Sequence, residues 1–146
     1  MSKAALPPLV RTLTHRLHTL HKLSDRASQD AYLAEAGMSM SEGRCLAAIG
    51  AFEPMSVNDL ALNANLDKAQ ASRAAQSLVD SGFVRKGPDA GDGRGVVLAL
   101  TAKGRARCQR VMALIERRND EIFGCLEAAE RRQLGVFLDR LIAHAR

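Results

Sequence analysis

The stretch from Asp67 to Gly104 constrains the fold more than any other, because the residues that begin and end its elements are marked. It reads DKAQASRAAQSLVDSGFVRKGPDAGDGRGVVLALTAKG. Asp67 can cap a helix start and Gly82 can adopt the left-handed conformation that ends helices, so a helix of about four turns is predicted between them. One side of this helix is small and apolar and the other is mostly polar. The two sides hold Ala71, Ala74, Ala75 and Leu78, and Ala69, Ser72, Arg73 and Gln76, respectively.

A β-hairpin is predicted after this helix, because two short strand-like segments flank a glycine-rich turn. The first strand is expected from Phe83 to Lys86 and the second from Val96 to Leu100, with PDAGDGRG between them. Asp92, Gly93 and Arg94 lie at the tip. An arginine on such a loop can enter a DNA minor groove, which does not admit a helix.

Thr101 is expected to cap the helix that follows the hairpin. The segment DGRGVVLALTAKG resembles the signature of the multiple-antibiotic-resistance regulator (MarR) family of winged helix-turn-helix transcription factors. That signature is an Asp-x-Arg wing, an apolar strand and Leu-Thr-x-x-Gly. The resemblance continues upstream through SVNDLALNANLDKAQASRAAQSLVDSGFV and more loosely over the whole chain. Gly93 stands where the family often has another cation, and Lys86 stands where arginine is common.

The resemblance implies a mainly α fold with a small β wing. Residues 1–146 would form one MarR-like domain, with a winged helix-turn-helix DNA-binding lobe at 39–104. Dimerisation helices would occupy 1–36 and 105–146, with the first and last helices of two chains interlocked. The length agrees with one compact unit, since 146 residues are too few for two sizeable domains.

The helix-turn-helix is also predicted from its own boundary residues. Ser39 followed by Glu42 is a capping-box pattern, and Glu53 with Pro54 ends the helix that it starts. That helix is expected to turn Cys45, Leu46, Ile49 and Phe52 inward. A second start at Ser56 with Asp59 opens a short helix containing Leu60 and Leu62, before a turn from Asn63 to Leu66.

The chain ends carry apolar stripes at helical spacing. One long amphipathic helix is predicted from Leu6 to Glu35, with Pro7 and Pro8 in its first turn. So small a chain cannot bury a helix of this length on its own core, which favours contact with a second subunit. The last two helices have stripes of their own, and Glu127 stands where Ser or Thr would commonly cap the final one. These stripes are Val111, Ile115, Ile122 and Leu126, and Leu134, Phe137, Leu138, Leu141 and Ile142.

The charge of the chain is a weaker indication of DNA binding than the placement of individual cations. The net charge is +5 and the pI about 9.6, yet residues 56–100 hold five basic and five acidic side chains. We therefore select the candidate DNA contacts by position on the exposed helix face and the wing. Arg85 and Lys86 either contact phosphates or serve as ordinary strand-edge charges. The candidates are Lys68, Gln70, Ser72, Arg73, Gln76, Arg85, Lys86, Asp92 and Arg94.

Other chemistries are less well supported by the sequence. His15, His18 and His21 recur every third residue, so neighbouring pairs suit a metal, but the row drifts around its helix and no metal site is assigned. Cys45, Cys108 and Cys125 are expected to be reduced thiols. With no phosphate loop, HExxH pattern or nucleophile elbow, we expect no enzyme, no catalytic residues and no cofactor. The absence of a long apolar run predicts a cytoplasmic protein without a membrane partner.

The sequence thus predicts a homodimeric transcriptional regulator that binds double-stranded DNA at a pseudo-palindromic operator, and the resemblance favours a ligand-responsive repressor. The family's effectors are small aromatic carboxylates or phenols, which bind between the two lobes. His15, Arg16 and Arg44 are candidate partners for such an anion, although surface or capping roles suit them too. Two alternatives stay open: a winged helix that binds protein without an operator, and a regulator that senses metal or redox state.

Overall fold

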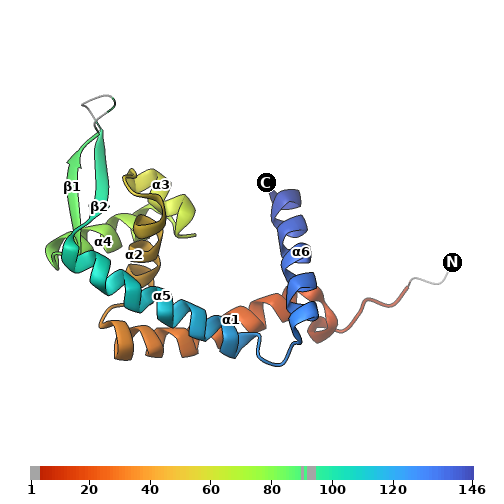
Figure 1. The fold of residues 1–146 in the computed structure, drawn as a ribbon. Helices are drawn as coiled ribbons and strands as arrows, with labels where there is room; N and C mark the ends of the chain where they lie inside the picture. The colour runs from red at the N-terminus through yellow and green to blue at the C-terminus, as the bar shows by residue number, and fades with distance from the viewer. Residues whose placement is uncertain (1–3, 90, 92–94) are drawn as a thin grey trace. The chain divides into compact units, whose positions relative to one another are not determined.

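The structure is a computed structural model that describes residues 4–89, 91 and 95–146. It is mainly helical with a two-stranded antiparallel sheet, which confirms the predicted fold class. The chain forms two compact units, Met1–Leu114 and Ile115–Arg146, and each is described by itself (Figure 1). This division differs from the predicted one, which separates a DNA-binding lobe at 39–104 from dimerisation helices at 1–36 and 105–146. The predicted division assumes a second subunit, so it stays a prediction.

The first unit contains the helix-turn-helix and the hairpin. Its helix α5 (Ala102–Ile122) runs on into the second unit. The preceding elements are η1 (Leu9–Arg11), α1 (Leu13–Ala31), a π-helical segment η2 (Tyr32–Ala36), α2 (Met40–Phe52), α3 (Val57–Asn63), α4 (Lys68–Asp80), β1 (Val84–Pro88) and β2 (Val96–Leu100).

The core lies where α2, α3 and α4 pack together beneath the sheet and the start of α5. The predicted inner side of α4 is buried, because its three alanines let the helix approach its neighbours closely. Helices α2 and α4 both begin with capping boxes, at Ser39 with Glu42 and at Asp67 with Gln70. The largest fully buried side chains are Cys45, Leu46, Ile49, Leu60, Leu78, Leu98 and Val111.

The hairpin joins the helical core through its second strand. Val84 pairs with Leu100 and Pro88 with Val96, and the backbone of Met55 makes a further bridge to Leu98. The predicted second strand is confirmed. The first strand begins one residue later than predicted and ends two later. Phe83 belongs to the turn that ends α4, because its amide donates to the carbonyl of Leu78 at 2.9 Å after Gly82 adopts a positive φ of 81°.

Two expectations for the helices are wrong. The N-terminal segment is not one helix from Leu6 to Glu35, because Thr12 ends η1 and caps a new helix by accepting from the amide of His15. Phe52 lies in the last turn of α2 and is 58% exposed instead of facing the core.

The second unit holds the end of α5 and the helix α6 (Ala128–Ala145). Arg131 joins them by donating to the carbonyl of Phe123 and to the carboxylate of Asp120. Glu127 occupies the cap position of α6, and its amide donates to Glu130 at 2.9 Å. None of the helices that the structure describes is long and apolar enough to cross a membrane.

Candidate nucleic-acid interface

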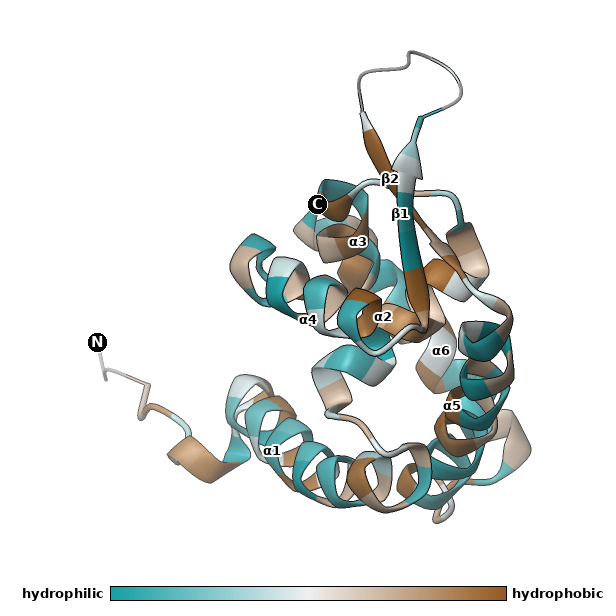
Figure 2. Cartoon of the chain, turned by 90° about the vertical axis from the view of Figure 1, so that its left-hand side faces the viewer, coloured by the Kyte–Doolittle hydropathy of each residue, from teal (hydrophilic) through white to brown (hydrophobic). Residues whose placement is uncertain are grey.

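The outward side of α4 carries three exposed polar side chains. Lys68, Ser72 and Arg73 are exposed, and among the described residues none of these three side chains has a hydrogen-bond or ion-pair partner. In Figure 2, hydrophilic segments alternate with paler and brown ones along α4, and the middle of β1 is hydrophilic. Two cations and a hydroxyl therefore remain available to an external partner.

Arg73 lies at an open hollow between the start of α2 and α4, the second helix of the helix-turn-helix, which we call the recognition helix. The hollow has a volume of about 260 Å³, and its acidic member is Glu42. The carboxylate of Glu42 is engaged, since Ser77 Oγ donates to it at 3.0 Å and the amide of Ser39 donates at 3.4 Å. The lining residues are Ser39, Ser41, Glu42, Gln70, Arg73, Ala74 and Ser77.

Three other predicted contacts already have partners within the chain. Gln70 Oε1 accepts from the amide of Asp67 at 3.2 Å as part of the helix cap. Lys86 Nζ donates to Gln76 Oε1 at 2.7 Å, which brings the strand cation onto the recognition helix. Gln76 in turn donates from Nε2 to Asp80 at 2.8 Å.

The wing is only partly described. Arg85 is exposed on β1 and, like Arg73, has no partner among the described residues. Asp92 and Arg94 lie outside the described residues, so their predicted roles stay predictions. Just beyond the end of β1, where the turn of the wing begins, Asp89 accepts from the amide of Gly91 at 2.9 Å.

The recognition helix and the hairpin are held in place by contacts that the sequence analysis did not identify. Lys103 Nζ donates to the carbonyl of Ser81 at 2.9 Å and lies 4.7 Å from the centre of the Phe83 ring. Arg107 lies 4.9 Å from the same ring and donates to the carbonyl of Ala36. Both cations lie on exposed or half-buried turns of α5, where helical periodicity does not distinguish them from solvated charges.

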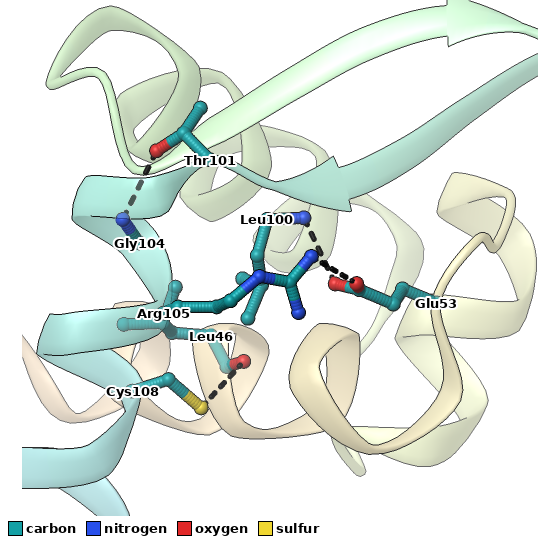
Figure 3. A network of polar contacts seen from close by, with 7 residues as sticks. All are labelled: Leu46, Glu53, Leu100, Thr101, Gly104, Arg105 and Cys108. Atoms are coloured by element: carbon teal, nitrogen blue, oxygen red, sulfur yellow. Dashed lines mark hydrogen bonds and ion pairs between the residues drawn. The ribbon is translucent and has the colours of Figure 1, made fainter.

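A second set of polar contacts ties the base of the wing to α2 and α5 (Figure 3). One oxygen of Glu53 accepts from the amide of Leu100 at 2.9 Å, and the other lies 3.0 Å from the Arg105 guanidinium. Thr101 accepts from the amide of Gly104 at 3.0 Å, which confirms the predicted cap of α5. The sequence marked Glu53 only as a helix end, since its partners are far away in the chain.

The three candidate anion partners do not converge in the described structure. The guanidinium of Arg44 lies 3.1 Å from Asp25, which also lies 3.0 Å from His21. Asp25 is ten residues beyond His15 on α1, a rise of about 15 Å along the helix axis. Arg44 is therefore held far from His15, and Arg16 is exposed on the same early turn of α1.

The cysteines lie in surroundings that disfavour redox chemistry at two of the three positions. Burial, with the nearby Glu42 carboxylate, raises the pKa of Cys45 to about 11. Burial, with Glu53, also raises the pKa of Cys108, whose thiol donates to the carbonyl of Leu46 at 3.7 Å. Thiolates react and thiols do not, so both side chains behave as small core hydrophobes. Cys125 is exposed.

The histidine row gives no metal-binding geometry in the part of the chain that the structure describes. Within those residues, no three His, Cys, Asp or Glu side chains gather as a ligand set. His21 instead forms the pair with Asp25 on the next turn of its own helix.

Helices α3 and α4 followed by an antiparallel hairpin define this chain as a winged helix-turn-helix protein. The family model described as the MarR family matches residues 36–95. The HTH-type transcriptional repressor Rv2887 of Mycobacterium tuberculosis is 26% identical over 116 residues, which are 80% of this chain and 84% of that protein.

Solved structures share the fold over nearly the whole chain. The PcaV transcriptional regulator of Streptomyces coelicolor, solved in complex with its natural ligand, has a TM-score of 0.80 at 21% identity and covers 97% of this chain and 99% of its own. A mutant MarR from E. coli, solved with operator DNA, has a TM-score of 0.77 at 24% identity and covers 90% and 94%, respectively. Residues 36–95 thus match the MarR family model, and the chain shares its fold with transcriptional regulators of that family.

Proposed function

We propose that this protein is a homodimeric, ligand-responsive repressor that recognises a pseudo-palindromic operator through α4 and the wing. The observation that carries the proposal is the pair of unengaged cations on the recognition helix, Lys68 and Arg73, with no partner among the described residues. A guanidinium can make forked hydrogen bonds to guanine or to phosphate, and an ammonium suits phosphate.

The wing extends the proposed contact. Arg94 would enter the minor groove beside the major groove that α4 occupies, and Arg85 would contact the phosphates between them. Asp92, from the same segment of the sequence, is a further proposed contact. Ser72 and Gln70 are proposed base or phosphate contacts along the same helix, because both are exposed beside Arg73.

The proposed dimer is supported by apolar side chains that this chain alone leaves uncovered. Leu17 on α1 is 59% exposed and Leu141 on α6 is 62% exposed, and neither helix has a fully buried residue. A second copy with two-fold symmetry would cover both stripes and would place two recognition helices about 10 base pairs apart.

An effector would act by favouring a different separation of those helices. A ligand that binds one arrangement better lowers the DNA affinity by its differential affinity for the two arrangements. A small aromatic carboxylate or phenol is the proposed class. Its candidate partners are either Arg44 or the adjacent His15 and Arg16, because the structure holds Arg44 far from His15. Because Arg44 is paired with Asp25, binding there requires this arginine to exchange one carboxylate for another.

The test is binding to the intergenic DNA beside the protein's own gene, measured by fluorescence anisotropy across a salt series with a scrambled duplex as control. We expect a preference for the intergenic duplex and an affinity that falls with salt. The Arg73→Ala variant should weaken binding, whereas Arg110→Ala, at an exposed position of α5, should not. A folded protein with no preference for any genomic fragment over the scrambled duplex would refute the proposal.

Protein recognition without DNA is the second candidate. It is favoured by Phe52 and Leu62, two large apolar side chains that the DNA-binding model leaves unused on the exposed surface of α2 and α3. Association of the purified chain with duplex DNA that is weak and insensitive to salt would support this candidate over the first.

A further inference from the structure

We propose that Gln76 is a positioning residue that holds the Lys86 ammonium on the recognition helix for a DNA phosphate, and that it does not read a base. This inference rests on the proposed function and assigns a role within its site. Gln76 lies on α4, Asp80 one turn further along the same helix, and Lys86 on β1.

The two contacts of the Gln76 amide fix its orientation. Its oxygen accepts from Lys86 Nζ at 2.7 Å and its nitrogen donates to Asp80 Oδ1 at 2.8 Å. With the amide reversed, the NH₂ group would face the ammonium and the oxygen would face the carboxylate, and both contacts would become repulsive. The side chain therefore spans from Asp80 to Lys86 along the protein surface. Reading adenine would require both ends of the amide to turn toward the base edge together.

The amide also keeps the two charges apart. Among the described residues, Lys86 and Asp80 form no direct ion pair, because Gln76 lies between them. Lys86 uses one of its three N–H groups on Gln76 and has two left for phosphate oxygens. A long, flexible side chain held in place before binding loses less conformational freedom when it contacts DNA. Arg85, the neighbouring cation on β1, has no hydrogen-bond or ion-pair partner that would hold its side chain in the described part of the chain.

The first test measures the network without DNA. In side-chain ¹H–¹⁵N spectra of the free protein, the Lys86→Ala and Asp80→Asn variants should each shift the Gln76 amide resonances. Lys68→Ala, which removes a cation at the other end of α4, should leave these resonances in place. Gln76 resonances that respond to neither Lys86→Ala nor Asp80→Asn would overturn the network itself.

The second test measures DNA binding with a double-mutant cycle. Each of the two variants, Gln76→Ala and Lys86→Ala, should weaken binding to the operator by the same factor as binding to the scrambled duplex. Each should also reduce the salt slope, which is the change of log affinity with log salt concentration, by about one. The double variant should lose no more affinity than Lys86→Ala alone, because both changes remove the same phosphate contact. In the matched control, the losses from Gln76→Ala and Lys68→Ala should multiply.

Two results of this cycle would overturn the inference. One is a change of base preference at a single operator position in Gln76→Ala with the salt slope unchanged, which is the signature of a base contact. The other is independent, multiplying losses for Gln76→Ala and Lys86→Ala while the wild type binds its operator normally. If the wild-type protein does not bind DNA, the proposed function is refuted. The proposed role of Gln76 in DNA binding is then refuted too, even if the spectra of the free protein confirm its contacts with Lys86 and Asp80.

Discussion

Gly104, in the first turn of α5, lies directly against the carbonyl group of Phe83, the residue that enters the wing. A Cβ atom at position 104 would overlap the Phe83 carbonyl oxygen, which is backbone and cannot rotate away. The amide of Thr101 donates to that same oxygen at 3.1 Å. The close approach therefore sets how the hairpin is seated on α5, and only glycine permits it.

The Gly104→Ala variant should be destabilised by about 1–3 kcal/mol, because the added methyl group forces the hairpin and α5 apart. Urea unfolding followed by circular dichroism measures the effect. Gly87→Ala, on β1, is the matched control, since a Cβ there meets no atom within 4 Å. Equal stability of the two variants would contradict this account of the contact.

The two contacts of the Glu53 carboxylate, with the Leu100 amide and with the Arg105 guanidinium, should contribute unequally to the free energy of unfolding. Glu53→Ala leaves the Leu100 amide without its acceptor and should cost about 1–3 kcal/mol. Arg105→Ala removes only a solvent-exposed partner of the same carboxylate and should cost under about 1 kcal/mol. Chemical denaturation of both variants checks the order, and a larger loss for Arg105→Ala would reverse the assignment.

Stability should fall at alkaline pH through Cys45. Burial raises the pKa of this thiol to about 11 in the folded chain, against an ordinary value of 9.0 in the unfolded chain. The folded state binds the proton more tightly, so its advantage is complete below pH 9 and is lost as the pH rises to about 11. The free energy of unfolding should drop more steeply over this window in the wild type than in Cys45→Ala. Parallel curves would exclude the effect.

The proposed dimer should depend on the apolar stripe of α6. Leu141→Asp places a charge where we propose that a second subunit packs, and it should shift the protein to monomer in light scattering coupled to size exclusion. Leu62→Asp is the control, because this leucine is 77% exposed on α3, outside the predicted dimerisation helices. A Leu141→Asp protein that remains dimeric would place the interface elsewhere.

Local chemistry made much of the first unit predictable. Asp67 and Ser39 cap helices by bonding to amides three residues away, and Gly82 ends α4 because its backbone can adopt a positive φ. The spacing of the α4 alanines indicated its buried side in the same way, since a helix repeats its faces every few residues. None of these features depends on a distant part of the chain.

Other features were decided only by tertiary structure. Phe52 fits the apolar spacing of α2 but lies beyond the edge of the core, so its side chain is exposed. Gln76 and Lys86 were both predicted as DNA contacts, yet their bond to each other joins a helix to a strand. Glu53 likewise meets Leu100 and Arg105, 47 and 52 residues away.

The sequence by itself determined where α2, α4 and the second strand begin, which side of α4 is apolar, and the family signature of the wing. Those properties follow from short-range hydrogen bonding and periodicity, which act within a few residues. The tertiary structure decided which exposed cations remain unengaged and which are already held by the protein. That distinction depends on side chains from separate elements meeting in space, and no local pattern encodes such a meeting.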